Sequence, residues 1–140
     1  MVGVPVIDTG LMTVEEFYAF TDTRPDEEKW ELIDGEPILS AAPSRLHQRI
    51  VKNLILALGN RERELAVSWT VLPGLGVRVS DTDRPEPDVL VIPSDFRSLD
   101  PQERDTSDVI VAFEVLSPST KGRDLRWKRT AYTGLPSLTH

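Results

Sequence analysis

The chain has 140 residues, a formal net charge of −7 and no cysteine. This length suits one compact domain, and the absence of cysteine excludes disulfides, cysteine–zinc sites and thiol catalysis. The negative charge argues against a protein that coats DNA through many phosphate contacts, but not against a nuclease with a locally basic surface. No apolar run approaches the roughly 20 residues of a membrane span, and no signal peptide is visible, so we expect a cytoplasmic protein.

Hydrophobic periodicity and turn residues predict the order of the structural elements. They predict a loose leader over 1–11, a helix over 13–20, a hairpin over 30–40, a helix over 44–60, strands over 69–72, 77–79, 88–92 and 109–116, a loop over 93–107 and a helix over 124–132. This order is typical of a mixed α/β (α+β) fold, with helices packed on a sheet, in one domain over 12–140.

Local signals support three of these elements. Thr13 and Glu16 have the spacing of a capping box, which predicts the start of the first helix. Asp34-Gly35 is a favoured two-residue hairpin turn. Ser44 is a favoured N-cap at the start of the long helix.

Two acidic residues occur in apolar runs. Glu114 interrupts the run from Val109 to Leu116, which predicts a strand buried on both faces. Asp88 precedes a second apolar run. A buried carboxylate must be neutral, paired or bound to a metal, because burying it alone costs several kcal/mol or more.

The predicted last helix carries a lysine on its apolar face. Leu125, Lys128 and Tyr132 share that face at positions i, i+3 and i+7. If Lys128 folds back on the sheet, it meets Asp88 and Glu114. Two carboxylates and a lysine suit phosphodiester hydrolysis, in which carboxylates hold Mg²⁺ and lysine offsets charge on the phosphate.

Each residue also has a purely structural interpretation. Glu114 would then be the buried partner of an arginine, Asp88 a turn residue, and Lys128 a side chain that extends along apolar surface to solvent. A basic run follows Glu114, and its side chains either contact phosphates or form a solvated face. Its candidate phosphate contacts are Lys121, Arg123 and Arg126.

Several segments together resemble a known family. They are Glu31-Leu32-Ile33-Asp34-Gly35-Glu36, Pro43-Ser44 leading to His47-Gln48, Arg84-Pro85-Glu86-Pro87-Asp88-Val89-Leu90-Val91, Glu114-Val115-Leu116-Ser117-Pro118-Ser119-Thr120, and Arg123-Asp124-Leu125 followed by Lys128. Over Thr13 to Tyr132 the chain resembles the Uma2 family of endonucleases, in the PD-(D/E)XK, or restriction-endonuclease-like, superfamily.

The resemblance implies a mixed sheet flanked by helices and a Mg²⁺-dependent DNA nuclease, with Mn²⁺ as a substitute ion. Asp88 and Glu114 match the metal ligands. The superfamily's usual lysine position, two residues after the glutamate, is Leu116 in this chain, and Lys128 matches the lysine that Uma2-like sequences carry on the following helix.

Two further residues match the family pattern. Glu31 matches an acid that completes the catalytic set, against the alternative of a solvated hairpin acid. His47 matches a family histidine to which we assign only an accessory place, against the alternative of a hydrogen-bonded residue at a helix start.

The resemblance also suggests that the chain is truncated, because the family pattern continues into another strand after the last helix. A missing strand exposes a sheet edge, so we expect a homodimer. The predicted function is a Mg²⁺-dependent DNA endonuclease. The alternatives are a non-catalytic nucleic-acid-binding or assembly module of the same fold, or a metal-dependent hydrolase of another substrate.

Overall fold

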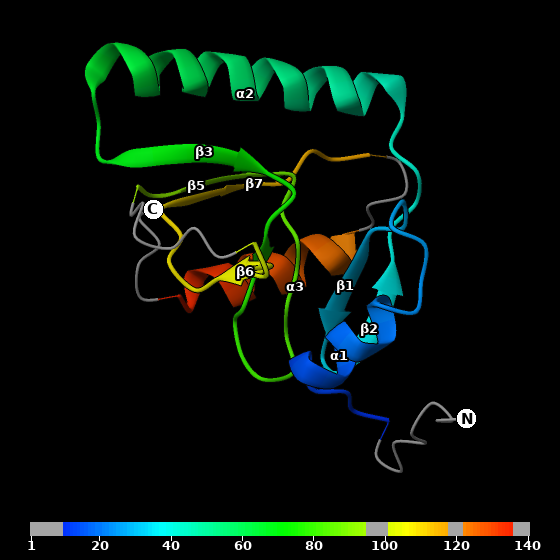
Figure 1. Ribbon diagram of the computed structural model, residues 1–140. Coiled ribbons are helices and arrows are strands. Elements are labelled where there is room, and N and C mark those ends of the chain that lie inside the picture. The colour runs from blue at the N-terminus through cyan, green and yellow to red at the C-terminus, as the bar shows by residue number, and fades with distance from the viewer. Residues whose placement is uncertain (1–9, 95–100, 118–121, 136–140) are drawn as a thin grey trace.

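A computed structural model describes residues 10–94, 101–117 and 122–135, without the side chains of 122–124 (Figure 1). Its elements are α1 (Val14–Thr21), β1 (Trp30–Ile33), β2 (Glu36–Leu39), α2 (Arg45–Leu65), β3 (Trp69–Pro73), β4 (Gly76–Val77), β5 (Val89–Pro93), β6 (Asp105–Thr106), β7 (Val111–Phe113) and α3 (Gly122–Thr133). The predicted leader falls mainly on residues outside the described ranges.

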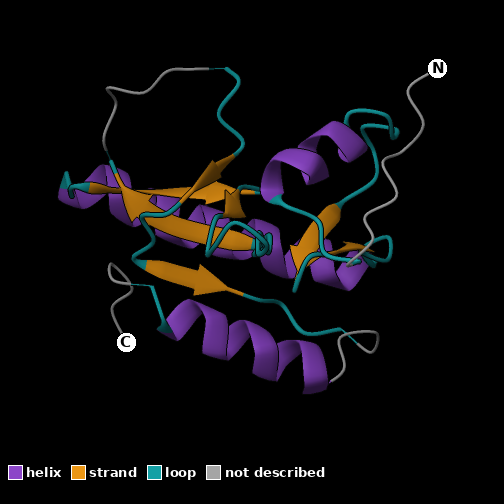
Figure 2. Ribbon diagram, turned by 90° about the horizontal axis from the view of Figure 1, so that it is seen from below, coloured by secondary structure: helices purple, strands orange, loops and turns teal. Residues whose placement is uncertain are grey.

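The main sheet is antiparallel, in the order β3-β5-β7, and lies between two helices (Figure 1, Figure 2). Apolar side chains of α2 pack on one face, around Val71, Val89 and Val91. On the other face Leu90 packs with Tyr132 of α3. The predicted mixed fold with helices flanking the sheet is therefore confirmed.

A separate hairpin of β1 and β2 packs beside this sheet with α1. Asp34 and Gly35 both have positive φ angles, 50° and 75°, as the predicted two-residue turn requires. The hairpin is tied to the segment before β5, because Leu32 and Arg84 exchange backbone hydrogen bonds of 3.1 and 2.7 Å. This link fixes the position of β1 relative to the main sheet.

Both predicted helix starts are confirmed. The hydroxyl of Thr13 accepts from the backbone N–H of Glu16 at 3.2 Å, and the hydroxyl of Ser44 accepts from that of His47 at 3.1 Å. The predicted end of the long helix at residue 60 is wrong, since α2 continues to Leu65. The added residues include arginine, glutamate and leucine, which favour helix.

The strand prediction for 109–116 is wrong in length and in burial. Only Val111–Phe113 form β7, and all three are half-buried. Among the described strands β7 pairs with β5 alone, so it lies at an edge of the sheet. Glu114 therefore follows the strand instead of lying within it.

Two further boundaries differ from prediction around the smallest sheet. The predicted strand over 77–79 is reduced to β4, because Val79 donates its N–H to Asp83 within a turn. The predicted loop over 93–107 contains β6, which pairs with β4 in parallel.

None of the helices in the described ranges has the length and apolar character needed to cross a membrane. The homodimer and the cytoplasmic location stay predictions.

Candidate active site

Asp88 and Glu114 lie next to each other at one end of the main sheet. The β5–β7 register ends at the pair Val89 and Phe113. Asp88 donates its backbone N–H to the carbonyl of Phe113 at 3.0 Å, and its Oδ2 accepts from the N–H of Val115 at 2.7 Å. Asp88 is thus bonded to the residues on both sides of Glu114. This arrangement brings the two predicted metal ligands to one place.

Lys128 of α3 reaches between two carboxylates. Its Nζ lies 2.9 Å from Oε2 of Glu31 and 3.0 Å from Oε1 of Glu114. The side chains are 9%, 9% and 16% exposed for Lys128, Glu31 and Glu114, so the ion pairs are largely shielded from water. Burial disfavours the ammonium form, but Glu31 and Glu114 outweigh burial and raise the pKa of Lys128. The lysine is therefore a cation held by two acids.

Tyr132, one helical turn after Lys128, contacts the same carboxylate. Its phenol donates a hydrogen bond of 2.8 Å to Oε1 of Glu114. Burial, reinforced by the charge and hydrogen bond of Glu114, raises the pKa of Tyr132 and keeps the phenol neutral. The sequence places Tyr132 on the helical face of Lys128 but does not distinguish a hydrogen-bond donor from a packing residue.

The pKa of Glu114 is raised above its ordinary value. Burial is the main cause, and Glu31 adds repulsion, while Lys128 and Tyr132 act in the opposite direction. Burial makes this carboxylate costly to ionise, and the bonds from Lys128 and Tyr132 offset part of that cost.

Asp88 has its own partners, one from the first turn of α2 and one from the residue before β1. Nε2 of His47 lies 3.1 Å from its Oδ1, and Nζ of Lys29 lies 3.6 Å from the same oxygen. The Nδ1 atom of His47 is buried without a hydrogen-bond partner in the described structure. The structure thus places His47 against a predicted metal ligand, and it adds Lys29, which sequence reasoning missed.

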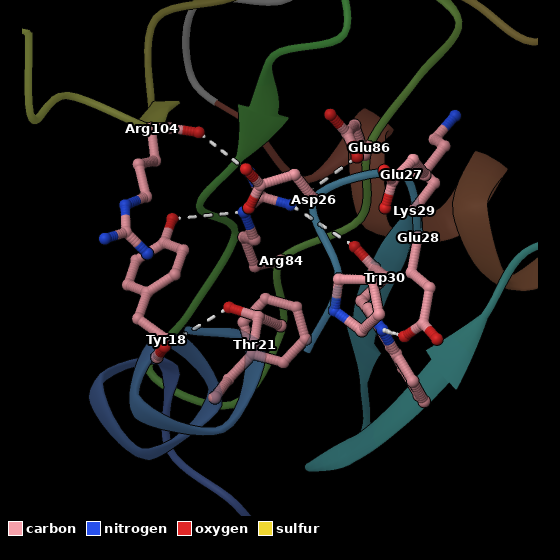
Figure 3. Close-up of a pocket in the computed structure, with 12 residues that line it drawn as sticks. Tyr18, Thr21, Asp26, Glu27, Glu28, Lys29, Trp30, Arg84, Glu86 and Arg104 are labelled. Atoms are coloured by element: carbon pink, nitrogen blue, oxygen red, sulfur yellow. Dashed lines mark hydrogen bonds and ion pairs between the residues drawn. The ribbon is translucent and has the colours of Figure 1, made fainter. Parts of the chain in front are cut away.

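Glu86 was also missed, and it connects the site to a neighbouring cavity. Its backbone N–H donates to Oε2 of Glu31 at 2.7 Å. Burial, followed by weaker repulsion from Glu31, raises the pKa of its own carboxyl. Glu86 and Lys29 also line a cavity of about 400 Å³, which Figure 3 shows with Trp30 and Arg84 on its wall.

The donor set fits an ion that needs few protein ligands. In the described part of the chain no three Asp, Glu or His side chains form a group able to hold a metal ion. Mg²⁺ is usually bound by one or two carboxylates, with waters and substrate phosphates filling its remaining positions. Asp88 and Glu114 are such a pair, and a carboxylate has about four acceptor positions in all. The residues present therefore suit Mg²⁺ or Mn²⁺ better than a fully protein-ligated ion.

The predicted phosphate contacts are only partly visible. Lys121 lies outside the described residues, as does the side chain of Arg123. Arg126 is exposed on α3.

Comparisons with known proteins bear on the family and the fold of this chain. A family model described as "Uma2: Putative restriction endonuclease" matches residues 14–139. A crystal structure of "a putative nuclease belonging to DUF820" from Anabaena variabilis ATCC 29413 is similar, with a TM-score of 0.62 and 20% sequence identity. The similarity covers 82% of this chain and 64% of that chain, so this chain spans less than two thirds of that protein. No curated protein matches.

Proposed function

The chain belongs to the Uma2 family, and from this premise we propose that it is a nuclease that hydrolyses phosphodiester bonds of DNA with the help of Mg²⁺. Asp88 and Glu114 are the proposed metal ligands, and Lys128 and Glu31 complete the catalytic set. The similar fold of a protein described as a putative nuclease also supports this function.

One observation carries the proposal. The ammonium group of Lys128, whose side chain is 9% exposed, lies between the carboxylates of Glu31 and Glu114. Asp88 is hydrogen-bonded to Val115, the residue after Glu114. Two carboxylates on one buried ammonium group leave an excess of negative charge that a divalent cation would offset. Two acids and a lysine at one end of a sheet are the groups that metal-assisted hydrolysis of a phosphodiester uses.

Each side chain has a task in this proposal. A bound Mg²⁺ would lower the pKa of a water molecule and polarise the phosphoryl oxygen. Lys128 stabilises negative charge that develops on the phosphate, and Glu31 keeps Lys128 in place. His47 and Tyr132 are positioning residues, which orient the carboxylates of Asp88 and Glu114 respectively.

The test is nicking of supercoiled plasmid with Mg²⁺ or Mn²⁺ by the unmodified chain and by Glu114→Gln. We expect nicking by the unmodified chain, and a loss of at least about 100-fold in the variant, the scale of a lost essential group. Glu64→Gln is the matched control, because Glu64 is an exposed acid on α2. Equal nicking by all three proteins, or none by the unmodified chain, contradicts the proposal.

A second candidate is a non-catalytic nucleic-acid-binding or assembly module of the same fold. It is favoured by the direct pairing of Lys128 with both Glu31 and Glu114, which gives each carboxylate a cationic partner without a metal. Titration calorimetry separates the two. Binding of DNA with no heat from Mg²⁺ or Mn²⁺ indicates the module, whereas metal binding that Asp88→Asn abolishes indicates the nuclease.

A further inference from the structure

Lys29 places a partly exposed cation directly beside the candidate carboxylates. It lies just before β1, and its carbonyl accepts a 2.9 Å hydrogen bond from the N–H of Ser40, which follows β2. The hairpin therefore fixes the backbone of Lys29. Its Nζ lies 3.6 Å from Oδ1 of Asp88, a proposed metal ligand, so the ammonium group is at the site itself.

The contact with Asp88 does not lock the ammonium group of Lys29 in place. A distance of 3.6 Å is an ion pair but exceeds the length of a hydrogen bond. The side chain of Lys29 is 37% exposed, whereas that of Asp88 is 10% exposed. Lysine carries its rotatable donors on a flexible stem, so this group is able to turn from Asp88 towards a ligand.

Asp88 has closer partners than Lys29 on both of its oxygens. Its Oδ2 accepts from the N–H of Val115 at 2.7 Å, and its Oδ1 lies 3.1 Å from Nε2 of His47. Pairing with Asp88 is therefore not enough to explain why a partly exposed ammonium group lies at this place.

Lys128, the other lysine at the site, is engaged within the protein. Its Nζ lies 2.9 Å from Oε2 of Glu31 and 3.0 Å from Oε1 of Glu114, and its side chain is 9% exposed. Its ammonium group therefore acts from inside the site. A substrate that arrives from solvent meets the more exposed Lys29 first.

The cavity beside the site leads to the same lysine. The cations on its wall are Lys29, Arg84 and Arg104 (Figure 3). Arg84 donates to the carbonyl of Arg104 at 2.8 Å, and Arg104 pairs with Asp22 at 2.8 Å. Of these three side chains, Lys29 alone donates no hydrogen bond to the residues that the structure describes. It is thus the cation that this surface offers to an anion.

We propose that Lys29 binds the phosphate of the nucleic-acid substrate at the candidate site. This inference rests on the proposed nuclease function and names the side chain that meets its substrate. The acids of the site repel a phosphate, and an ammonium group beside Asp88 offsets part of this repulsion. Lysine binds phosphate as a point charge, and a phosphate contact carries no sequence information. Binding through Lys29 is therefore independent of sequence.

The experiment compares Lys29→Gln with two matched variants. Lys29→Arg keeps the charge, and Lys52→Gln removes a lysine from the exposed side of α2. Binding of a short labelled duplex is measured in EDTA at several salt concentrations. EDTA prevents cleavage, so the readout is affinity alone. Urea unfolding of each variant measures its stability.

We expect Lys29→Gln to reduce the slope of log affinity against log salt by about 0.9, the contribution of one phosphate contact, which weakens binding by about 8-fold near about 0.1 M salt. The other two variants should keep the slope. The reduction should be the same for duplexes of different sequence.

Four results would overturn the inference. They are an equal reduction in Lys52→Gln, the same reduction in Lys29→Arg, no binding by the unmodified chain, and an unchanged slope in Lys29→Gln. An unchanged slope together with a loss of stability would identify Lys29 as a structural partner of Asp88 only.

Plasmid nicking separates failure of this inference from failure of the proposed function. Nicking that Glu114→Gln abolishes, together with an unchanged salt slope in Lys29→Gln, keeps the nuclease and removes Lys29 as a substrate contact. A reduced slope without metal-dependent nicking keeps the phosphate contact and removes the nuclease. If both hold, Lys29→Gln should raise KM for the plasmid more than it lowers kcat, because a contact made equally before and during the reaction acts on KM.

Discussion

The phenol of Tyr132 donates a 2.8 Å hydrogen bond to Oε1 of Glu114, the same oxygen that lies 3.0 Å from Nζ of Lys128. Tyr132 and Lys128 are one turn apart on α3, so a single helix supplies both groups that hold this carboxylate. The orientation of Glu114 at the sheet end therefore depends on how α3 packs on the sheet.

Replacing Tyr132 by Phe removes one of these partners and keeps the ring in the core. We expect the variant to lose about 1.5–3 kcal/mol of stability, the usual contribution of a hydrogen bond to a charged group. The pKa of Glu114 should rise further, because the phenol lowers it. Urea unfolding measures the first effect, and carbon NMR of the carboxyl group measures the second.

Tyr18→Phe is the matched control for this variant. Tyr18 is a half-buried tyrosine whose phenol donates to Asp105, away from the site. The control variant should leave the pKa of Glu114 unchanged. An unchanged Glu114 pKa in Tyr132→Phe as well would show that the hydrogen bond does not act on this carboxyl.

Replacing Lys128 by Met leaves two buried acids without their cation. Removal of one partner from a buried ion pair typically costs about 3–5 kcal/mol, because the remaining charge is uncompensated. We expect a loss of that order, measured as the free energy of unfolding in urea near neutral pH. The loss should shrink in acid, where Glu114, whose pKa burial raises, becomes protonated and no longer needs the cation.

The control for this variant is Lys52→Met on the exposed side of α2. Substitutions of exposed residues without partners usually change stability by less than about 0.5 kcal/mol. Similar losses for both lysines would contradict the buried ion pairs.

Glu86 makes stability depend on pH with a defined sign. Burial raises its pKa above the ordinary value of 4.5, and repulsion from Glu31 adds to this effect. A carboxyl whose pKa is higher in the folded chain stabilises the fold fully below its unfolded pKa, and this contribution is lost as pH rises through the folded pKa. Relative to Glu86→Gln, the unmodified chain should therefore lose stability as pH rises above 4.5.

Urea midpoints of both proteins between about pH 3 and 8 test this sign. Glu28→Gln gives the opposite comparison, because hydrogen bonds from Arg24 and Trp30 lower the pKa of Glu28. Relative to that variant, the unmodified chain should gain stability as pH rises towards 4.5. Slopes of the same sign in both comparisons would exclude this assignment of charges.

Local chemistry explains most of what the sequence predicts about the fold. The capping box at Thr13 and the Asp34-Gly35 turn depend on neighbours within a few residues, so both are visible in the sequence and confirmed in the structure. The burial of β7 is different. Apolar composition shows that a strand packs, but the number of strands paired beside it depends on the rest of the chain, and β7 is half-buried at an edge.

The candidate site divides in the same way. An acid in an apolar run and a lysine on an apolar helix face are visible in the sequence, and the structure brings Glu114 and Lys128 into contact. The partners of Asp88 are not visible in this way. His47 and Lys29 reach it only after α2 and the hairpin are placed, and nothing in their local sequence indicates this meeting.

Two glycines, the buried Gly76 and the half-buried Gly59, give opposite predictions for substitution by alanine. A Cβ on Gly76 would overlap the guanidinium group of Arg84, whereas a Cβ on Gly59 meets only Val71, at 3.9 Å. Arg84 cannot move away cheaply, because it donates to the phenol of Tyr18 at 3.1 Å and to the carbonyl of Arg104 at 2.8 Å.

We therefore expect Gly76→Ala to destabilise the chain by about 1–3 kcal/mol, the usual cost of overfilling a packed interior. Gly59→Ala should stabilise it by up to about 1 kcal/mol, because alanine is the better helix former and α2 has room for the methyl group. Thermal and urea unfolding of both variants measure the difference. A neutral Gly76→Ala would mean that Arg84 relaxes freely into the adjoining cavity, and its contacts would then contribute little to holding the hairpin against the segment before β5.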